Sequence, residues 1–166
     1  MSTTEVRTLR NYINGEFSVP EGCDWIEIEN PSTTEIIARA PMSSRAVTED
    51  AIAAAKAAYP QWARTPADRR VLPLFNLRSL MVDNMDMLSR LISEEMGKSV
   101  PDAQAEMKRA LENIEVGCGM PVLQQGDKMI GASWDIDGEV LKLPMGVFGM
   151  IAPFNFPGMI PFWFLP

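Results

Sequence analysis

The N-terminal part of the chain contains short runs in which hydrophobic and polar positions alternate, a pattern typical of half-buried strands. Trp25–Glu29 is one such run, and Ile36–Arg39 is another short run after a turn at Asn30-Pro31. Upstream, Asn14-Gly15 lies between β-forming residues, which strongly indicates a tight hairpin. The pattern therefore predicts an opening hairpin and two further strands, preceded by a flexible tail over residues 1–10.

Hydrophobic positions then recur at the helical period. Ser43 or Ser44 can cap a first helix containing Val47 and Trp62, and Pro60 is expected to kink or end it. Thr65-Pro66 predicts the start of the next helix, with Thr65 as cap and Pro66 at its first position.

Two further helices are predicted from their end signals. Asn84 separates a helix over about Met85–Met96 from the preceding one, and Gly97 suits the position after its end. Pro101-Asp102 opens the next helix. One side of that helix carries apolar residues at spacings of three and four: Met107, Leu111, Ile114 and Cys118. We expect this side to face the core.

The block from Pro144 to Pro166 holds no charged residue. Within it, Val147–Ala152 is a run of β-formers bounded by Gly146 and Pro153, which is typical of a strand buried on both faces of a parallel sheet. Pro157 suits the first position of a helix, so the block predicts a strand, a tight loop and a helix start. Its prolines would interrupt a membrane-spanning helix, so no membrane partner is predicted.

Between the helices and this block, the chain predicts a loop at Gly126-Asp127-Lys128. Ser133–Asp137 and Glu139–Leu143 then read as two strands, or as one strand broken at Gly138.

Composition narrows the function classes. The chain has 166 residues, which is enough for one domain with a substantial core, and a net charge of −7. This charge argues against nucleic acid as a partner. The sequence has no histidine and no paired cysteines, so it predicts neither a metal site nor a disulfide framework. Its first residues lack an apolar signal core, and a cytoplasmic location is expected.

Asn155 is the single strong polar side chain in the uncharged block. Ligands of open α/β sheets bind at the carboxyl ends of strands, where Asn155 would offer an amide that donates to a ligand oxygen. An Asn among prolines is also common in turns, and the residues alone leave both interpretations open.

Arg109 lies on the helix face formed by residues 105, 109, 112 and 116, beside the apolar side. The simpler interpretation is a surface arginine paired with Glu106 or Glu112 at a spacing of three. The alternative is a guanidinium that grips a carboxylate ligand in a bidentate manner.

Gly146-Val-Phe-Gly-Met-Ile-Ala-Pro-Phe-Asn-Phe-Pro-Gly-Met-Ile-Pro-Phe-Trp resembles the start of the NAD-binding domain in the aldehyde dehydrogenase superfamily. There a Pro-aromatic-Asn-Phe-Pro segment follows the first Rossmann strand. Phe154, where most of the superfamily has Trp, is similar to the branch of methylmalonate-semialdehyde and malonate-semialdehyde dehydrogenases. The resemblance extends over nearly the whole chain from Tyr12.

The resemblance implies an α/β fold that is the N-terminal part of the aldehyde dehydrogenase fold, truncated before the catalytic domain. Its strands and helices over residues 11–132 would begin the NAD-binding domain. Residues 133–143 would form arm strands that add to a neighbouring subunit's sheet in a dimer or tetramer. Residues 144–166 would hold the first Rossmann strand, the Pro-Phe-Asn-Phe-Pro loop and a helix start.

The resemblance also assigns roles to site residues. Asn155 would donate to the aldehyde oxygen as a thiolate attacks, and Arg109, which follows Glu94-Glu95-Met96-Gly97-Lys98-Ser99, would hold the substrate's carboxylate. Phe156 would contact the substrate. Four residues match the segment that lines the NAD site: Ile151, Ala152, Pro153 and Phe154.

The family's nucleophilic cysteine has no counterpart before Pro166. Cys23 and Cys118 lack its sequence context, and Lys98 and Lys142 are expected to face solvent.

The implied activity is NAD-dependent, CoA-acylating oxidation of methylmalonate or malonate semialdehyde, with coenzyme A as co-substrate. One alternative is a dehydrogenase for another semialdehyde or an aliphatic aldehyde. Another is a non-catalytic interaction module that acts through the arm and the apolar end. The isolated chain is expected to be inactive.

Overall fold

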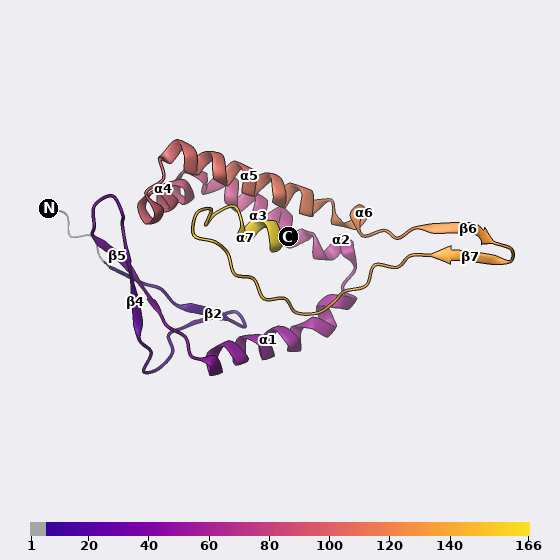
Figure 1. Ribbon diagram of the computed structural model, residues 1–166, viewed down its shortest axis with the longest axis horizontal. Coiled ribbons are helices and arrows are strands. Elements are labelled where there is room, and N and C mark those ends of the chain that lie inside the picture. Colours follow the sequence, from indigo (N-terminus) through magenta and orange to yellow (C-terminus); the bar gives the residue numbers. More distant parts are fainter. Residues whose placement is uncertain (1–5) are drawn as a thin grey trace.

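The computed structural model describes residues 6–166 and is an α/β arrangement in which helices dominate (Figure 1). Its strands are β1 (Arg7–Thr8), β2 (Asn11–Ile13), β3 (Glu16–Ser18), β4 (Trp25–Glu29), β5 (Ile36–Pro41), β6 (Lys128–Ser133) and β7 (Ile136–Glu139). Its helices are α1 (Arg45–Arg64), α2 (Ala67–Arg70), α3 (Leu72–Asp83), α4 (Met85–Met96), α5 (Val100–Cys118), α6 (Met120–Leu123) and α7 (Pro161–Phe164).

The N-terminal strands confirm the expected hairpin and turn. β2 and β3 pair antiparallel around Asn14 and Gly15, whose φ angles are 51° and 85°, as a tight hairpin turn requires. Ser32 N–H donates to the Asn30 side chain at 2.9 Å, which fixes the turn between β4 and β5. β4 pairs antiparallel with β5, and β1 pairs with β5 in parallel. Residues 7–8 are therefore paired, contrary to the predicted tail, whereas residues 1–5 lie outside the described part.

The helix boundaries follow the sequence signals at most ends. The Ser44 hydroxyl accepts from Val47 N–H, so Ser44 is the cap of α1. α4 begins after Asn84 and ends at Gly97, whose φ of 78° is the left-handed conformation that favours glycine.

The helix ends differ from the sequence signals at two points. α1 continues through Pro60 to Arg64, so Pro60 does not end the helix, because one lost backbone hydrogen bond near an exposed helix end is tolerated. The Thr65 hydroxyl donates to the carbonyl of Gln61 at 2.9 Å, so it serves the end of α1 and does not cap α2.

The core lies between α3, α4 and α5. The buried residues of α5 recur at the helical period, and Leu111 and Cys118 pack beside them, as predicted from the apolar side. Met81 of α3 and Ile92 of α4 complete this cluster. The apolar members from α5 are Ala103, Met107, Ala110 and Ile114. This arrangement fixes which side of α5 faces outward.

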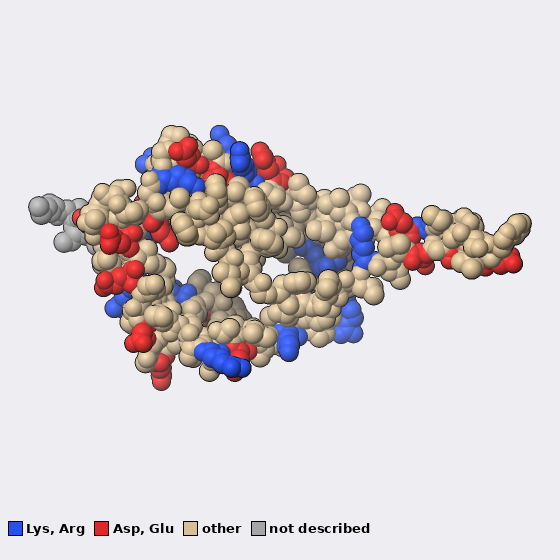
Figure 2. Space-filling view, viewed as in Figure 1, with Lys and Arg blue, Asp and Glu red and all other residues tan. Residues whose placement is uncertain are grey.

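β6 and β7 form a hairpin that extends away from the helices (Figure 1), and acidic side chains lie along it (Figure 2). Its turn is at Trp134-Asp135, where Asp135 has a φ of 59°. The predicted strands Ser133–Asp137 and Glu139–Leu143, with their break at Gly138, are therefore misplaced, because β6 begins at Lys128 and Gly138 lies inside β7. Trp134 at the tip is 95% exposed.

The buried strand predicted over Val147–Ala152 is not formed in the described chain, where this segment is extended and unpaired. Ile151 is fully exposed. A parallel strand needs neighbours at its edges and layers over both faces, and residues 6–166 supply neither. The helix predicted to begin at Pro157 begins instead at Pro161, because the intervening residues form a turn against α5.

Within the described residues, no helix is both long and apolar enough to span a membrane.

Candidate active site

A cavity of about 470 Å³ lies between the N-terminal half of α5 and the loop that follows Pro153. It brings together three residues singled out in the sequence, namely Arg109, Asn155 and Phe156. Its remaining lining residues are Met96, Lys98, Asp102, Ala105 and Glu106. The cavity therefore joins two segments that are far apart in the sequence.

Arg109 stands on the exposed side of α5, opposite the core. Among residues 6–166, no carboxylate lies within ion-pair distance of its guanidinium, so neither Glu106 nor Glu112 is its partner. The pairing that a simple surface arginine would make is therefore absent from this part of the chain. The charge of Arg109 stays available at the cavity wall.

Glu106 is buried, with 3% of the residue exposed, and its carboxylate holds the loop to α5. Oε1 accepts from Gly158 N–H at 2.8 Å and from Met159 N–H at 3.0 Å. Oε2 accepts from the Lys98 ammonium at 2.5 Å. Three donors thus compensate one buried negative charge.

Lys98 was predicted to face solvent, and this prediction is wrong, because only 13% of its side chain is exposed. Besides pairing with Glu106, its Nζ donates to the main-chain carbonyl of Asn155 at 3.1 Å. The same Nζ lies 4.2 Å from the centre of the Phe156 ring, a cation–π distance. The ammonium thus contacts two adjacent residues of the loop.

Sequence reasoning missed Glu106 and Lys98, although one signal was present. Glu106 falls on the same side of α5 as Ala103 and Ala110, which are fully buried. A charged residue on a buried side of a helix requires a partner. That partner is Lys98, which lies just before the helix.

Asn155 is exposed at the cavity wall, with its main chain fixed by Lys98. Its side-chain amide forms no hydrogen bond with any residue in the described range 6–166. The amide is therefore free to donate to a ligand in the cavity.

The segment predicted to contact NAD is exposed to solvent in this chain. Ile151, Ala152 and Pro153 are exposed, and 87% of Phe154 is exposed. They present apolar surface without the converging donors that a pyrophosphate needs. By themselves these residues do not form a dinucleotide site, and their role in binding NAD stays a prediction.

The two cysteines have free thiols and are partly buried. Burial raises the pKa of the Cys118 thiol, which lowers its thiolate fraction at neutral pH. Cys118 packs against the core cluster, so its surroundings suit a packing role.

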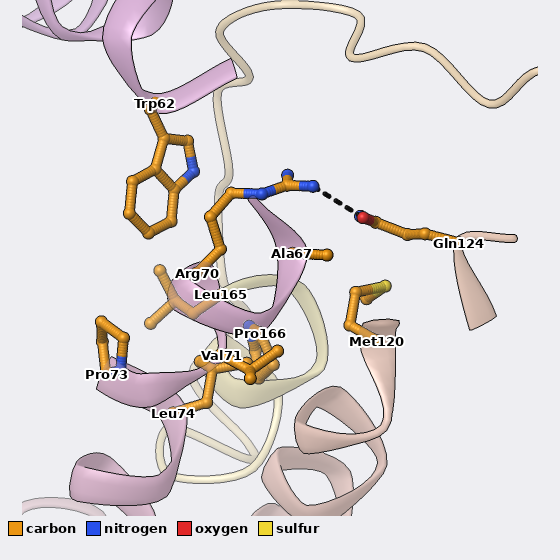
Figure 3. Close-up of a pocket in the computed structure, with 10 residues that line it drawn as sticks. All are labelled: Trp62, Ala67, Arg70, Val71, Pro73, Leu74, Met120, Gln124, Leu165 and Pro166. Carbon is orange, nitrogen blue, oxygen red and sulfur yellow. Dashed lines mark hydrogen bonds between the residues drawn. The ribbon is translucent and has the colours of Figure 1, made fainter. Parts of the chain in front are cut away.

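A second cavity, of about 290 Å³, lies where α2, α3 and α6 meet the end of the chain (Figure 3). Arg70 reaches across it and donates to the Gln124 side chain at 2.7 Å. Trp62 and Pro166 also line it. None of the predicted site residues lies here.

Replacing Gly158 by Ala is expected to lower the free energy of unfolding by about 1–3 kcal/mol, because the added methyl overpacks the core. Its Cβ would lie 2.5 Å from Met107 Sδ and 2.8 Å from Ile92 Cδ1. Urea denaturation of the chain measures this change. Gly149→Ala is the matched control, since nothing lies within 4 Å of its Cβ position. Equal stability of the two variants would contradict this packing.

Comparison with known proteins bears on this site. Residues 19–166 match the sequence model of the aldehyde dehydrogenase family. The chain belongs to the aldehyde dehydrogenase family. It is 39% identical over 165 residues to malonate-semialdehyde dehydrogenase 1 of Shouchella clausii, covering 99% of this chain and 34% of that protein. It is also 39% identical over 162 residues to malonate-semialdehyde dehydrogenase of Bacillus velezensis, covering 98% of this chain and 33% of that protein.

Solved aldehyde dehydrogenase structures share the fold. Methylmalonate-semialdehyde dehydrogenase from Oceanimonas doudoroffii is 37% identical with a TM-score of 0.89, over 95% of this chain and 32% of that structure. A Sinorhizobium meliloti protein assigned as methylmalonate-semialdehyde dehydrogenase and complexed with NAD is 36% identical with a TM-score of 0.87, at the same coverage.

The aldehyde dehydrogenase chain described here spans about a third of the length of these curated relatives. These matches confirm the predicted fold class, an α/β part of the aldehyde dehydrogenase fold.

Proposed function

We propose that this chain serves in an NAD-dependent aldehyde dehydrogenase that oxidises a short aldehyde carrying a carboxylate. Malonate semialdehyde or methylmalonate semialdehyde is the proposed substrate, and coenzyme A is the proposed acyl acceptor, giving acetyl-CoA or propionyl-CoA with loss of CO₂. Support comes from the family and from the names of the relatives, which are malonate- and methylmalonate-semialdehyde dehydrogenases.

The observation that carries this proposal is the cavity in which Arg109 and Asn155 meet. A semialdehyde has a carboxylate at one end and a carbonyl at the other. The guanidinium of Arg109 suits the carboxylate because its planar fork matches the two oxygens. Lys98 does not compete for that carboxylate, since its charge is taken up by Glu106.

Asn155 is proposed to act at the other end of the substrate. Attack by a thiolate converts the aldehyde oxygen into an oxyanion, and a fixed amide donor stabilises that charge more than it stabilises the neutral aldehyde. The main-chain carbonyl of Asn155 accepts a hydrogen bond from Lys98, while its side chain forms no hydrogen bond within residues 6–166. Phe156 is proposed to supply an apolar wall beside the substrate.

NAD is the proposed cofactor and would supply the hydride acceptor. Ile151, Ala152, Pro153 and Phe154 are proposed to contact it, but their open arrangement holds no pyrophosphate-binding donors. We therefore expect no NAD binding by this chain alone. The β6–β7 hairpin is proposed to join a neighbouring subunit's sheet in a homodimer or tetramer, because it projects from the helices and exposes its strand edges.

A non-catalytic interaction module is the second candidate. It is favoured by the exposed hairpin and by the unpaired apolar segment around Ile151. Under this alternative, residues 6–166 would bind a partner protein without turning over an aldehyde.

The test joins this chain, in place of the matching third, to the rest of malonate-semialdehyde dehydrogenase from Bacillus velezensis. This protein is called the chimaera below. NADH formation is followed with malonate semialdehyde and with propanal, its uncharged analogue, with and without coenzyme A. We expect turnover that requires coenzyme A, with kcat/KM about tenfold or more higher for malonate semialdehyde. The isolated chain should show no turnover of either aldehyde.

The unmodified Bacillus velezensis enzyme is the control for assay and folding. A folded chimaera that is inactive on both aldehydes would support the interaction module. Preference for propanal would exclude the proposed carboxylate substrate and leave an aliphatic aldehyde dehydrogenase. Turnover by the isolated chain would show that a nucleophile lies within residues 1–166.

A further inference from the structure

We propose that Glu106 and Lys98 form a clamp that positions the Asn155 loop on α5 and withdraws the charge of Lys98 from the cavity. The clamp is defined by the Glu106 carboxylate, the Lys98 ammonium and the main chain of residues 155–159. Its consequence for catalysis rests on the proposed function. Its structural part does not, and the two are tested separately.

The first step of the clamp is the anchoring of the loop. Both carboxylate oxygens of Glu106 are used, one by the amides of Gly158 and Met159 and the other by Lys98. Glu106 comes from the buried side of α5, where Ala103 and Ala110 pack in the core. The loop is thereby fixed to the most firmly packed helix of the described chain.

The second step is the reach of Lys98 to the reacting end of the site. Its Nζ donates to the carbonyl of Asn155 and lies against the ring of Phe156. The ammonium therefore fixes the main chain of the residue whose side chain is proposed to stabilise the oxyanion. A displacement of about 1 Å at a reacting group can lower a rate by about 10²-fold.

The third step concerns charge. Lys98 and Arg109 are the cations that line the cavity in the described structure, and only Lys98 is ion-paired. Glu106 thus leaves a single available cation, which fixes the end of the cavity at which a carboxylate binds. Without Glu106, Lys98 would become a second site for the carboxylate, close to the aldehyde end.

If Glu106 and Lys98 formed only a structural ion pair, a different result would be expected. Breaking the pair would lower the stability of the enzyme, and activity on both aldehydes would fall only because less of the enzyme is folded. The clamp predicts a lower kcat in folded enzyme with no increase in KM for malonate semialdehyde, because a freed Lys98 adds attraction for its carboxylate.

The structural part is tested by hydrogen exchange on the chain itself. In Glu106→Ala, the amides of Gly158 and Met159 lose their acceptor, and their exchange should rise about tenfold or more. Glu106→Gln keeps one acceptor oxygen and should give a smaller rise. Glu112→Ala is the matched control, an exposed glutamate on the same helix, and should leave both amides unchanged.

Unchanged exchange in both Glu106 variants would overturn the clamp. Should Glu106→Ala fail to fold, hydrogen exchange of the same two amides in Glu106→Gln decides whether the clamp exists.

The catalytic part is tested in the chimaera. Glu106→Gln and Lys98→Met should each lower kcat by about tenfold or more on both aldehydes. KM for malonate semialdehyde should stay level or fall in Glu106→Gln and should not fall in Lys98→Met, which leaves no freed cation. Glu112→Ala should match the parent chimaera.

A kcat that is unchanged in both variants would overturn the positioning role. A parent chimaera without activity would instead count against the proposed function, and the hydrogen-exchange result would still decide whether the clamp exists.

Discussion

Replacing Asn155 by Ala in the chimaera is expected to lower kcat by about 10²–10³-fold, because the proposed donor to the oxyanion is removed. KM should change little, since the amide acts mainly when the oxygen becomes negative. The loss should be similar for malonate semialdehyde and propanal, because both form the same oxyanion. Steady-state NADH formation measures both parameters.

The design separates this chemical effect from damage to the loop. The bond from Lys98 goes to the main-chain carbonyl of Asn155, so the Ala variant keeps it. Hydrogen exchange at Gly158 and Met159 should therefore equal that of the parent. A loss of kcat below about tenfold, with the loop intact, would contradict the assignment of Asn155 as the oxyanion donor.

Replacing Arg109 by Ala is expected to lower kcat/KM for malonate semialdehyde by about 10–100-fold, the effect of losing charge-assisted hydrogen bonds to a carboxylate. The value for propanal should change less than about twofold, because propanal has no group for the guanidinium to bind. Arg109→Lys should recover part of the loss, since it restores the charge without the planar fork. The kcat/KM ratio of the two aldehydes is the measurement.

Lys108→Ala provides the matched control for Arg109. Lys108 is an adjacent, exposed cation on α5 that does not line the cavity. It should leave the ratio of the two aldehydes unchanged. Equal losses on malonate semialdehyde and propanal in Arg109→Ala would remove the carboxylate from the proposed substrate and favour a neutral aldehyde.

Local signals were sufficient to predict most elements of this fold. α4 was predicted with its bounds Met85–Met96 because Asn84 and Gly97 mark both ends, and Gly97 adopts the left-handed conformation. The hairpin at Asn14-Gly15 and the apolar side of α5 were also readable, since each depends on residues close in sequence.

Predictions that depend on distant residues were less successful. The segment Val147–Ala152 has the composition of a buried strand, but pairing requires neighbours that residues 6–166 do not provide. Lys98 was expected in solvent because its contacts with Asn155 and Phe156 cross a long stretch of sequence. The expectation that Arg109 and Asn155 belong to one site came from the family resemblance, because no spacing rule connects a residue of α5 with the later loop.

The two sides of α5 bear on how the substrate range of such an enzyme can evolve. Arg109 protrudes from a helix whose inner residues, such as Ile114, are completely enclosed. Under the proposed role of Arg109, exchanging that outward side chain would alter which aldehydes are accepted while the interior stays as it is. Descendants of an ancestral gene could therefore diversify at this position through single substitutions, without first acquiring compensating changes elsewhere.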